Sequence, residues 1–147
     1  MKNVILALFL FTVAVACAQQ ASKHELNLSK SGVAVEGYDV VSYFDASAQK
    51  GSKVIASIYK GATYFFSSKK NKEKFDLNPL KYTPQYGGWC AYAMGDDGSK
   101  VSINPKTYKI LDGKLYLFYN KFGINTLKSW NKDEAKLKAK ADENWGK

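Results

Sequence analysis

The residues with the clearest chemical potential lie between Gly87 and Met94, where the chain reads Gly-Gly-Trp-Cys-Ala-Tyr-Ala-Met. Two glycines followed by small and aromatic residues predict a tight turn that leads into a short helix. Cys90 and Met94 are four residues apart, so such a helix would carry both sulfur atoms on one face. Two soft sulfur ligands on one face can hold Cu(I) if another part of the chain supplies a third ligand.

Cys90 has two other interpretations. A thiol near a helix N-terminus can have a lowered pKa and act as a nucleophile or a redox group. A cysteine is also a small hydrophobic residue, and a methionine can fill a gap in a core; this core interpretation is the one that we favour. The single His24 lies in a polar segment far along the chain from Cys90, so a Cys–His dyad is not expected. We assign no catalytic residue.

Aromatic residues and glycines define a second group of candidate site residues. The chain has 10 Tyr, 8 Phe and 3 Trp, and we expect most of them in the core. Some Tyr side chains are expected to line a cleft between the Gly87-Gly88 turn and the strand that carries Tyr64. Tyr92 is a further candidate for the wall of this pocket.

Asp39 follows Gly37-Tyr38 and precedes a short apolar run. A carboxylate in this place can accept hydrogen bonds from the first N–H groups of a helix over residues 40–44. It can also serve as the polar group of a ligand pocket. We favour the capping interpretation and keep Asp39 as a candidate pocket residue.

Two β-hairpins are predicted to position these residues. The hairpin at about 54–66 turns at Lys60-Gly61, and the hairpin at about 108–119 turns at Asp112-Gly113. Asp-Gly between two β-rich runs is a strong hairpin signal, because both central residues of a type I′ turn need a positive φ.

Helices are expected in most of the remaining segments. Ser67 or Ser68 can cap a helix that runs through Phe75 and ends at Asn78-Pro79. Between residues 127 and 145, mostly apolar residues recur at three- and four-residue steps, which predicts an amphipathic C-terminal helix. The predicted fold class is therefore α+β: a small antiparallel sheet of hairpins packed with short helices and this C-terminal helix.

Residues 1–18 have the features of a signal peptide. The apolar run Val4–Ala16 is shorter than the roughly 20 residues that span a membrane. Cleavage at the end of the segment would make Gln19 the first residue, and we favour this form. Alternatively, a loose lipobox would make Cys17 a lipid anchor. Both forms are exported, to the periplasm or the extracellular space, and no transmembrane span is expected after the signal is removed.

The composition indicates one folded domain and limits its chemistry. The chain has 147 residues, 46% of them hydrophobic, and a formal net charge of +9, which excludes a disordered tail. We expect a loose N-terminal arm over residues 19–31 and a single domain over residues 32–147. Two Cys and one His exclude a disulfide scaffold and a four-cysteine zinc site. Every basic residue is Lys; export and the absence of Arg argue against a nucleic-acid partner.

Several motifs, in order along the chain, resemble the YHS domain family. The aromatic strand 64–68 is followed by Phe75, Pro79 and Tyr82, as in that family. Three further segments resemble the secreted single-domain branch of that family, namely 37–44, 85–92 and 112–117. The resemblance extends from about residue 32 to residue 145.

The resemblance also bears on metal binding. YHS domains attached to heavy-metal pumps carry cysteines that suggest soft-metal binding, and these positions correspond to Ser67, Asn71 and a residue near Ser42. Hydroxyl and amide groups do not replace thiolate ligands for such metals. The cysteine site of the family is therefore absent, and Cys90 with Met94 remains the candidate metal site, with copper as the candidate ion.

Taken together, these features predict a small exported binding module, not an enzyme, that recognises a small ligand or a component of the cell envelope. The first alternative is an envelope protein that handles a soft metal through Cys90. The second alternative is a thiol-dependent enzyme.

Overall fold

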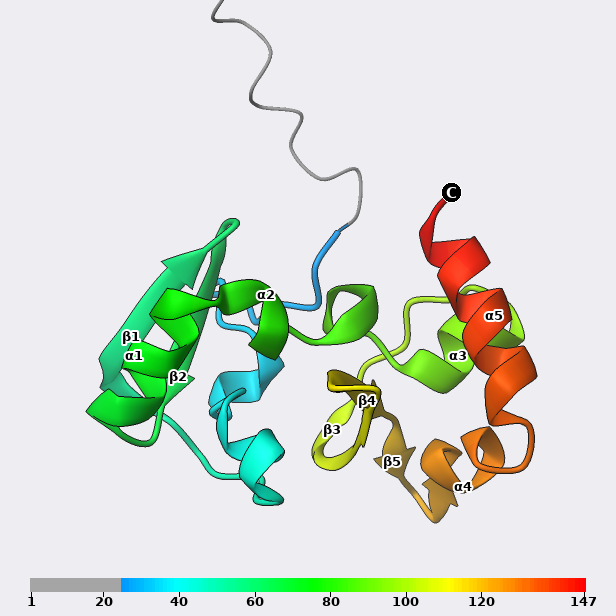
Figure 1. The fold of residues 1–147 in the computed structure, drawn as a ribbon. Helices are drawn as coiled ribbons and strands as arrows, with labels where there is room; N and C mark the ends of the chain where they lie inside the picture. Colours follow the sequence, from blue (N-terminus) through cyan, green and yellow to red (C-terminus); the bar gives the residue numbers. More distant parts are fainter. Residues whose placement is uncertain (1–24) are drawn as a thin grey trace, which may run out of the picture.

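The computed structural model describes residues 25–147. The predicted signal peptide, Cys17 and His24 lie outside the described residues. Figure 1 shows the arrangement of the elements. The 3₁₀ helices are η1 (Val35–Gly37), η2 (Ser42–Asp45) and η3 (Gln85–Gly88). The strands are β1 (Ser52–Tyr59), β2 (Ala62–Phe66), β3 (Asn104–Leu111), β4 (Lys114–Phe118), β5 (Asn120–Lys121) and β6 (Ile124–Asn125). The α-helices are α1 (Lys69–Leu77), α2 (Pro79–Tyr82), α3 (Ala91–Asp96), α4 (Thr126–Trp130) and α5 (Glu134–Trp145).

Both predicted hairpins are confirmed. Strands β1 and β2 pair antiparallel across Lys60-Gly61, and β3 and β4 pair antiparallel across Asp112-Gly113. At Asp112 and Gly113 φ is 51° and 71°, so both central residues have the positive φ that a type I′ turn needs. The α+β class is confirmed as well. Within residues 25–147, however, the strands form three separate two-stranded sheets and not one continuous sheet.

The first helix also begins and ends as the sequence predicts. The Ser68 side chain accepts a hydrogen bond from the backbone N–H of Asn71 and caps α1. The helix ends at Leu77, and Pro79 begins α2, where a missing N–H costs nothing. Ser67, the residue between strand β2 and this cap, is thereby fixed in place at the junction of β2 and α1.

The C-terminal region forms two helices, α4 and α5, and their apolar side packs on the rest of the protein. Trp130 and Ala141 are fully buried on this side. Helices α3 and α5 approach closely, because a Cβ atom on Gly95 would lie only 2.4 Å from the carbonyl oxygen of Leu137. The absence of a side chain at Gly95 is therefore what allows this helix pair to form.

The elements fall into two groups that lie side by side in Figure 1. One group contains β1, β2, α1 and α2, and the other contains α3, β3, β4, α4 and α5. A single apolar cluster joins the groups, since it contains Phe66 and Phe75 from the first and Leu115 and Leu117 from the second. The second cluster, around Trp130, belongs to the C-terminal group.

The expectation of a loose arm over residues 19–31 is wrong for residues 25–31. The backbone N–H of Asn27 donates to the carbonyl of Gly87 at 2.9 Å, and its side-chain amide donates to the carbonyl of Gly88 at 2.9 Å. Leu26 and Leu28 pack against the main apolar cluster. The arm is held mostly through backbone groups and one amide, and such contacts leave no periodic pattern in the sequence.

Candidate ligand-binding cavity

A cavity of about 190 Å³ lies between the first hairpin, the N-terminal arm and the η3 turn. Its apolar walls include Leu26, Leu28, Ala34 and Val35. An apolar cavity of about 150 Å³ is large enough to take up benzene. The cavity therefore has room for one small ring with a substituent.

The hairpin places two tyrosines at this cavity. In the register of β1 and β2, Tyr59 lies opposite Ala62 and Ser57 lies opposite Tyr64. Tyr59 and Tyr64 are therefore diagonal neighbours on one face of the hairpin, and both line the cavity. The ring of Tyr64 also packs 4.8 Å, between centroids, from the ring of Phe75, which fixes its position.

The hydroxyl of Tyr64 is the most unusual polar group of the lining. The residue as a whole is only 5% exposed, and its hydroxyl forms no hydrogen bond with any residue in the range 25–147. The hydroxyl oxygen itself still reaches solvent, because every fully buried side-chain nitrogen or oxygen of this range has a partner. Burial, with a smaller contribution from nearby Tyr59, raises the pKa of Tyr64 to about 12. A hydroxyl that has no partner in this part of the protein and remains open to solvent can donate to a bound molecule.

The η3 turn forms another wall through two glycines. Gly87 and Gly88 have φ of 61° and 84°. A Cβ atom on Gly87 would lie 2.8 Å from the indole ring of Trp145 and 3.2 Å from Leu26. Glycine is therefore required both for the backbone conformation and for the close approach of the arm and the end of α5.

Among the described residues 25–147, Lys60 is the only charged residue that lines the cavity. It occupies the β1–β2 turn, and its ammonium lies 5.4 Å from the centre of the Tyr59 ring. No Asp or Glu from the described part of the chain belongs to the lining. The electrostatic character of the cavity is therefore that of one exposed cation beside a mostly apolar space.

Tyr64, Gly87 and Gly88 line the cavity, whereas the other two predicted pocket residues, Asp39 and Tyr92, are absent from its lining. Tyr92 lies on α3 and packs beside the two apolar clusters. The lining also contains residues that the sequence did not predict there: the arm, Lys60 and Trp145. The sequence pattern could have indicated Trp145, because it is the last residue of the amphipathic stripe. The polar arm has no comparable pattern.

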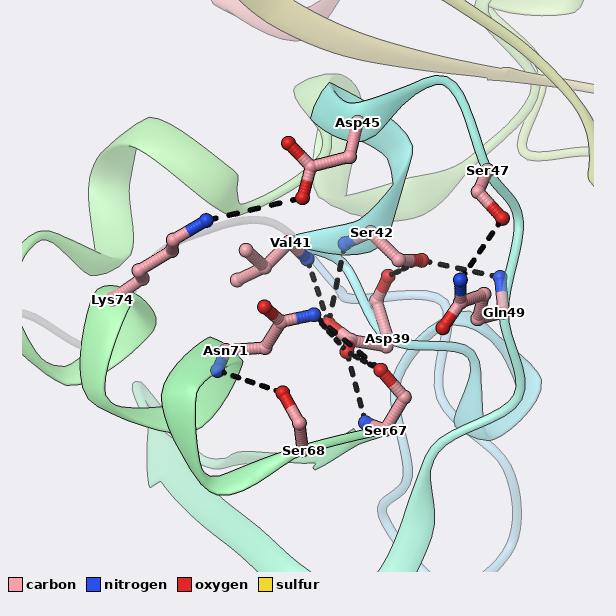
Figure 2. A network of polar contacts seen from close by, with 10 residues as sticks. All are labelled: Asp39, Val41, Ser42, Asp45, Ser47, Gln49, Ser67, Ser68, Asn71 and Lys74. Atoms are coloured by element: carbon pink, nitrogen blue, oxygen red, sulfur yellow. Dashed lines mark hydrogen bonds and ion pairs between the residues drawn. The ribbon is translucent and has the colours of Figure 1, made fainter.

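Asp39 is buried in a network of hydrogen bonds, which Figure 2 shows, and is 0% exposed. One carboxylate oxygen accepts from the backbone N–H groups of Val41 at 2.9 Å and Ser42 at 3.4 Å. The other accepts from the N–H of Ser67 at 2.9 Å, the hydroxyl of Ser67 at 2.7 Å and the amide of Asn71 at 2.7 Å. The capped element is the 3₁₀ helix η2 and not the helix expected over residues 40–44.

Cys90 and Met94 are both core residues. Cys90 is 0% exposed and belongs to the main apolar cluster, whereas Met94 belongs to the cluster around Trp130. The sulfur of Cys90 accepts from the N–H of Tyr119 at 3.3 Å and lies 3.4 Å from the hydroxyl of Thr126. Within residues 25–147, no group of three or more His, Cys, Asp or Glu side chains is arranged to hold a metal ion.

A comparison with protein families identifies part of the chain. Residues 43–86 match the family model of the YHS domain. This segment of the chain is therefore similar to a YHS domain. The match begins in η2, includes β1, β2, α1 and α2, and ends in η3. No curated protein and no solved structure matches the chain significantly. In the described part of the chain, no helix has the length and apolar character needed to cross a bilayer.

Two of the positions where the resemblance places cysteines of pump-attached YHS domains, Ser67 and Asn71, meet around Asp39, together with Ser42, which lies near the third. Ser67 and Asn71 both donate to its carboxylate, and Ser42 donates from its hydroxyl to the Asp39 carbonyl at 2.7 Å (Figure 2). These hydroxyl and amide groups are already used inside the protein, and they are not ligands that a soft metal prefers. The residues present at this place therefore do not fit a soft-metal site.

We predict that Asp39→Asn destabilises the fold by about 3 kcal/mol or more, because the new amide would turn a donor toward donors of Ser67 or Val41 and leave them unpaired. The matched control is Asp45→Asn, which removes only an exposed 3.8 Å pairing with Lys74 and should cost about 1 kcal/mol or less. Urea unfolding of both variants measures the difference. Equal stabilities for the two variants would contradict the role assigned to Asp39.

Cys90 should resist thiol reagents until the protein unfolds, because its side chain is fully buried. Cys90→Ala should lower the free energy of unfolding by on the order of 1 kcal/mol. We expect no stoichiometric binding of Cu(I) to the folded protein. Tight one-to-one binding that is lost in Met94→Leu, which keeps the volume but removes the sulfur, would instead support the metal-handling alternative.

Proposed function

We propose that this protein is a small exported binding module that holds a small organic ligand in the cavity beside Tyr64 and that it is not an enzyme. The observation that carries the proposal is the Tyr64 hydroxyl, which has no hydrogen-bond partner within residues 25–147. It belongs to a largely buried side chain that lines an apolar cavity of ring size. Ligand sites typically combine apolar walls with a few polar groups that fix the orientation of the ligand. This cavity has both features.

The surroundings of Cys90 support the non-enzymatic part of the proposal. Its sulfur contacts the backbone N–H of Tyr119 and the hydroxyl of Thr126. Neither group is a base that could take the thiol proton, and the side chain has no access to solvent. A nucleophilic thiol needs an activating base or cation and a path for substrate, so the thiol-enzyme alternative has no support at this residue.

Export is the part of the proposal that rests on the sequence of residues 1–18. Sequencing of the N-terminus of the native protein should give Gln19 as the first residue. A blocked, acylated Cys17 would show the lipid-anchored form of the same exported protein. Recovery of the protein from the cytoplasm with Met1 intact would contradict export.

We expect benzamide or benzoate, probes of ring size, to bind in the cavity and to shift the indole N–H signal of Trp145 in the NMR spectrum of the ¹⁵N-labelled protein. Trp145 lines the cavity. The signal of Trp130, whose indole N–H donates to Glu134 at 2.8 Å inside the protein, should stay unchanged and serves as the internal reference.

Two exposed leucines provide matched variants for this titration. Leu80 is 66% exposed and lines the cavity, whereas Leu77 is 88% exposed and does not. Leu80→Ser should weaken binding about threefold through loss of apolar contact area, and Leu77→Ser should leave it unchanged. If neither probe shifts the Trp145 signal up to its solubility limit, the cavity is not a ligand site and the proposal fails.

A further inference from the structure

The lining of the cavity also indicates the class of ligand, an inference that rests on the proposed function. We propose that the cavity binds a small organic monoanion, an aromatic or short aliphatic carboxylate, whose apolar body fills the cavity while its carboxylate accepts a hydrogen bond from Tyr64 and faces the ammonium of Lys60. Three features of the cavity favour this class of ligand: its hydrogen-bond donor, its charge and its size.

The first feature is the hydrogen-bond donor, the hydroxyl of Tyr64. A phenol hydroxyl with a pKa near 12 stays protonated at neutral pH, so Tyr64 offers a proton to a bound group. Tyr59 lies diagonally across the hairpin and influences the same hydroxyl electrostatically, which places a second phenol close by. A pair of neighbouring phenols favours a ligand group with more than one acceptor, as a carboxylate has.

The second feature is the charge of the cavity lining. Lys60 lines the cavity and forms no ion pair with any carboxylate of residues 25–147. Among residues 25–147, no Asp or Glu belongs to the lining, so a cationic ligand would find no opposite charge there. A ligand with one negative charge would use the unneutralised ammonium, and the net charge of +9 on the whole chain favours the approach of an anion from solution.

The third feature is the size of the cavity. A cavity of about 190 Å³ holds one ring or a short chain, and its walls of Leu26, Leu28 and Val35 suit an apolar body. A small inorganic anion has no apolar part that could pack against these walls, and a long acyl chain would not fit inside the cavity. A carboxylate attached to a single ring uses the donor, the cation and the apolar walls together.

Benzoate and benzamide separate this inference from the proposed function, because they share shape and acceptor oxygen but differ in charge. Benzoate should bind about two- to fivefold more tightly than benzamide, the range of one partly exposed ion pair, and added salt should reduce this preference. Calorimetric titration, or the Trp145 indole signal, measures both affinities. Equal affinities would overturn the anion inference and leave the cavity as a ligand site; no binding of either probe would overturn the proposed function itself.

Three variants test the residues assigned to the carboxylate. Lys60→Gln should abolish the preference for benzoate without lowering the affinity for benzamide, while Lys53→Gln, at an exposed position on β1 outside the lining, should keep the preference. Tyr64→Phe should weaken both probes about fivefold, because both lose one hydrogen bond. A benzoate preference that survives Lys60→Gln, or affinities unchanged by Tyr64→Phe, would overturn the assignment of these groups. Thermal melting shows whether each variant is folded.

Discussion

The structure depends on a buried carboxylate that forms no ion pair with any Lys of residues 25–147. Asp39 is fully buried and accepts five hydrogen bonds, from Val41, Ser42, Ser67 and Asn71. An ionised carboxylate in an apolar interior is strongly unfavourable unless such donors replace its hydration. The donors come from the start of η2, the end of β2 and the first turn of α1, so all three elements must be in place for the carboxylate to be satisfied. The position of Tyr64 follows from this constraint, because it lies on β2 just before Ser67.

The opposite wall of the cavity depends on backbone conformation. Gly87 allows the chain to turn with a positive φ and to pass within contact of Trp145, which lies at the end of α5. The carbonyls of Gly87 and Gly88 accept hydrogen bonds from the backbone N–H and the side-chain amide of Asn27. These bonds hold the arm against the cavity. The cavity is thus built from segments at both ends of the described chain, and the YHS match at residues 43–86 covers only part of its lining.

The features that the sequence predicts well are local ones. The turn at Asp112-Gly113, the cap at Ser68 and the amphipathic stripe that ends at Trp145 each arise from residues close together in the chain. The partners of Asp39 are different, since Ser67 and Asn71 are 28 and 32 residues away and a hydrogen bond between distant residues leaves no periodic pattern. For the same reason the polar arm was predicted to be loose, although two leucines and Asn27 hold it in place.

The two buried polar sites of the YHS region point to opposite roles. Around Asp39, the hydroxyl of Ser67 and the amide of Asn71 already donate to the carboxylate. Such a site stabilises the fold and has little left to offer a ligand. At Tyr64 the balance is reversed, because the hydroxyl has no hydrogen-bond partner within residues 25–147 and its side chain lines an open cavity. A bound molecule with an acceptor can pair with this hydroxyl without breaking a hydrogen bond inside the described part of the protein, which is why we locate the function at the cavity and not at Asp39.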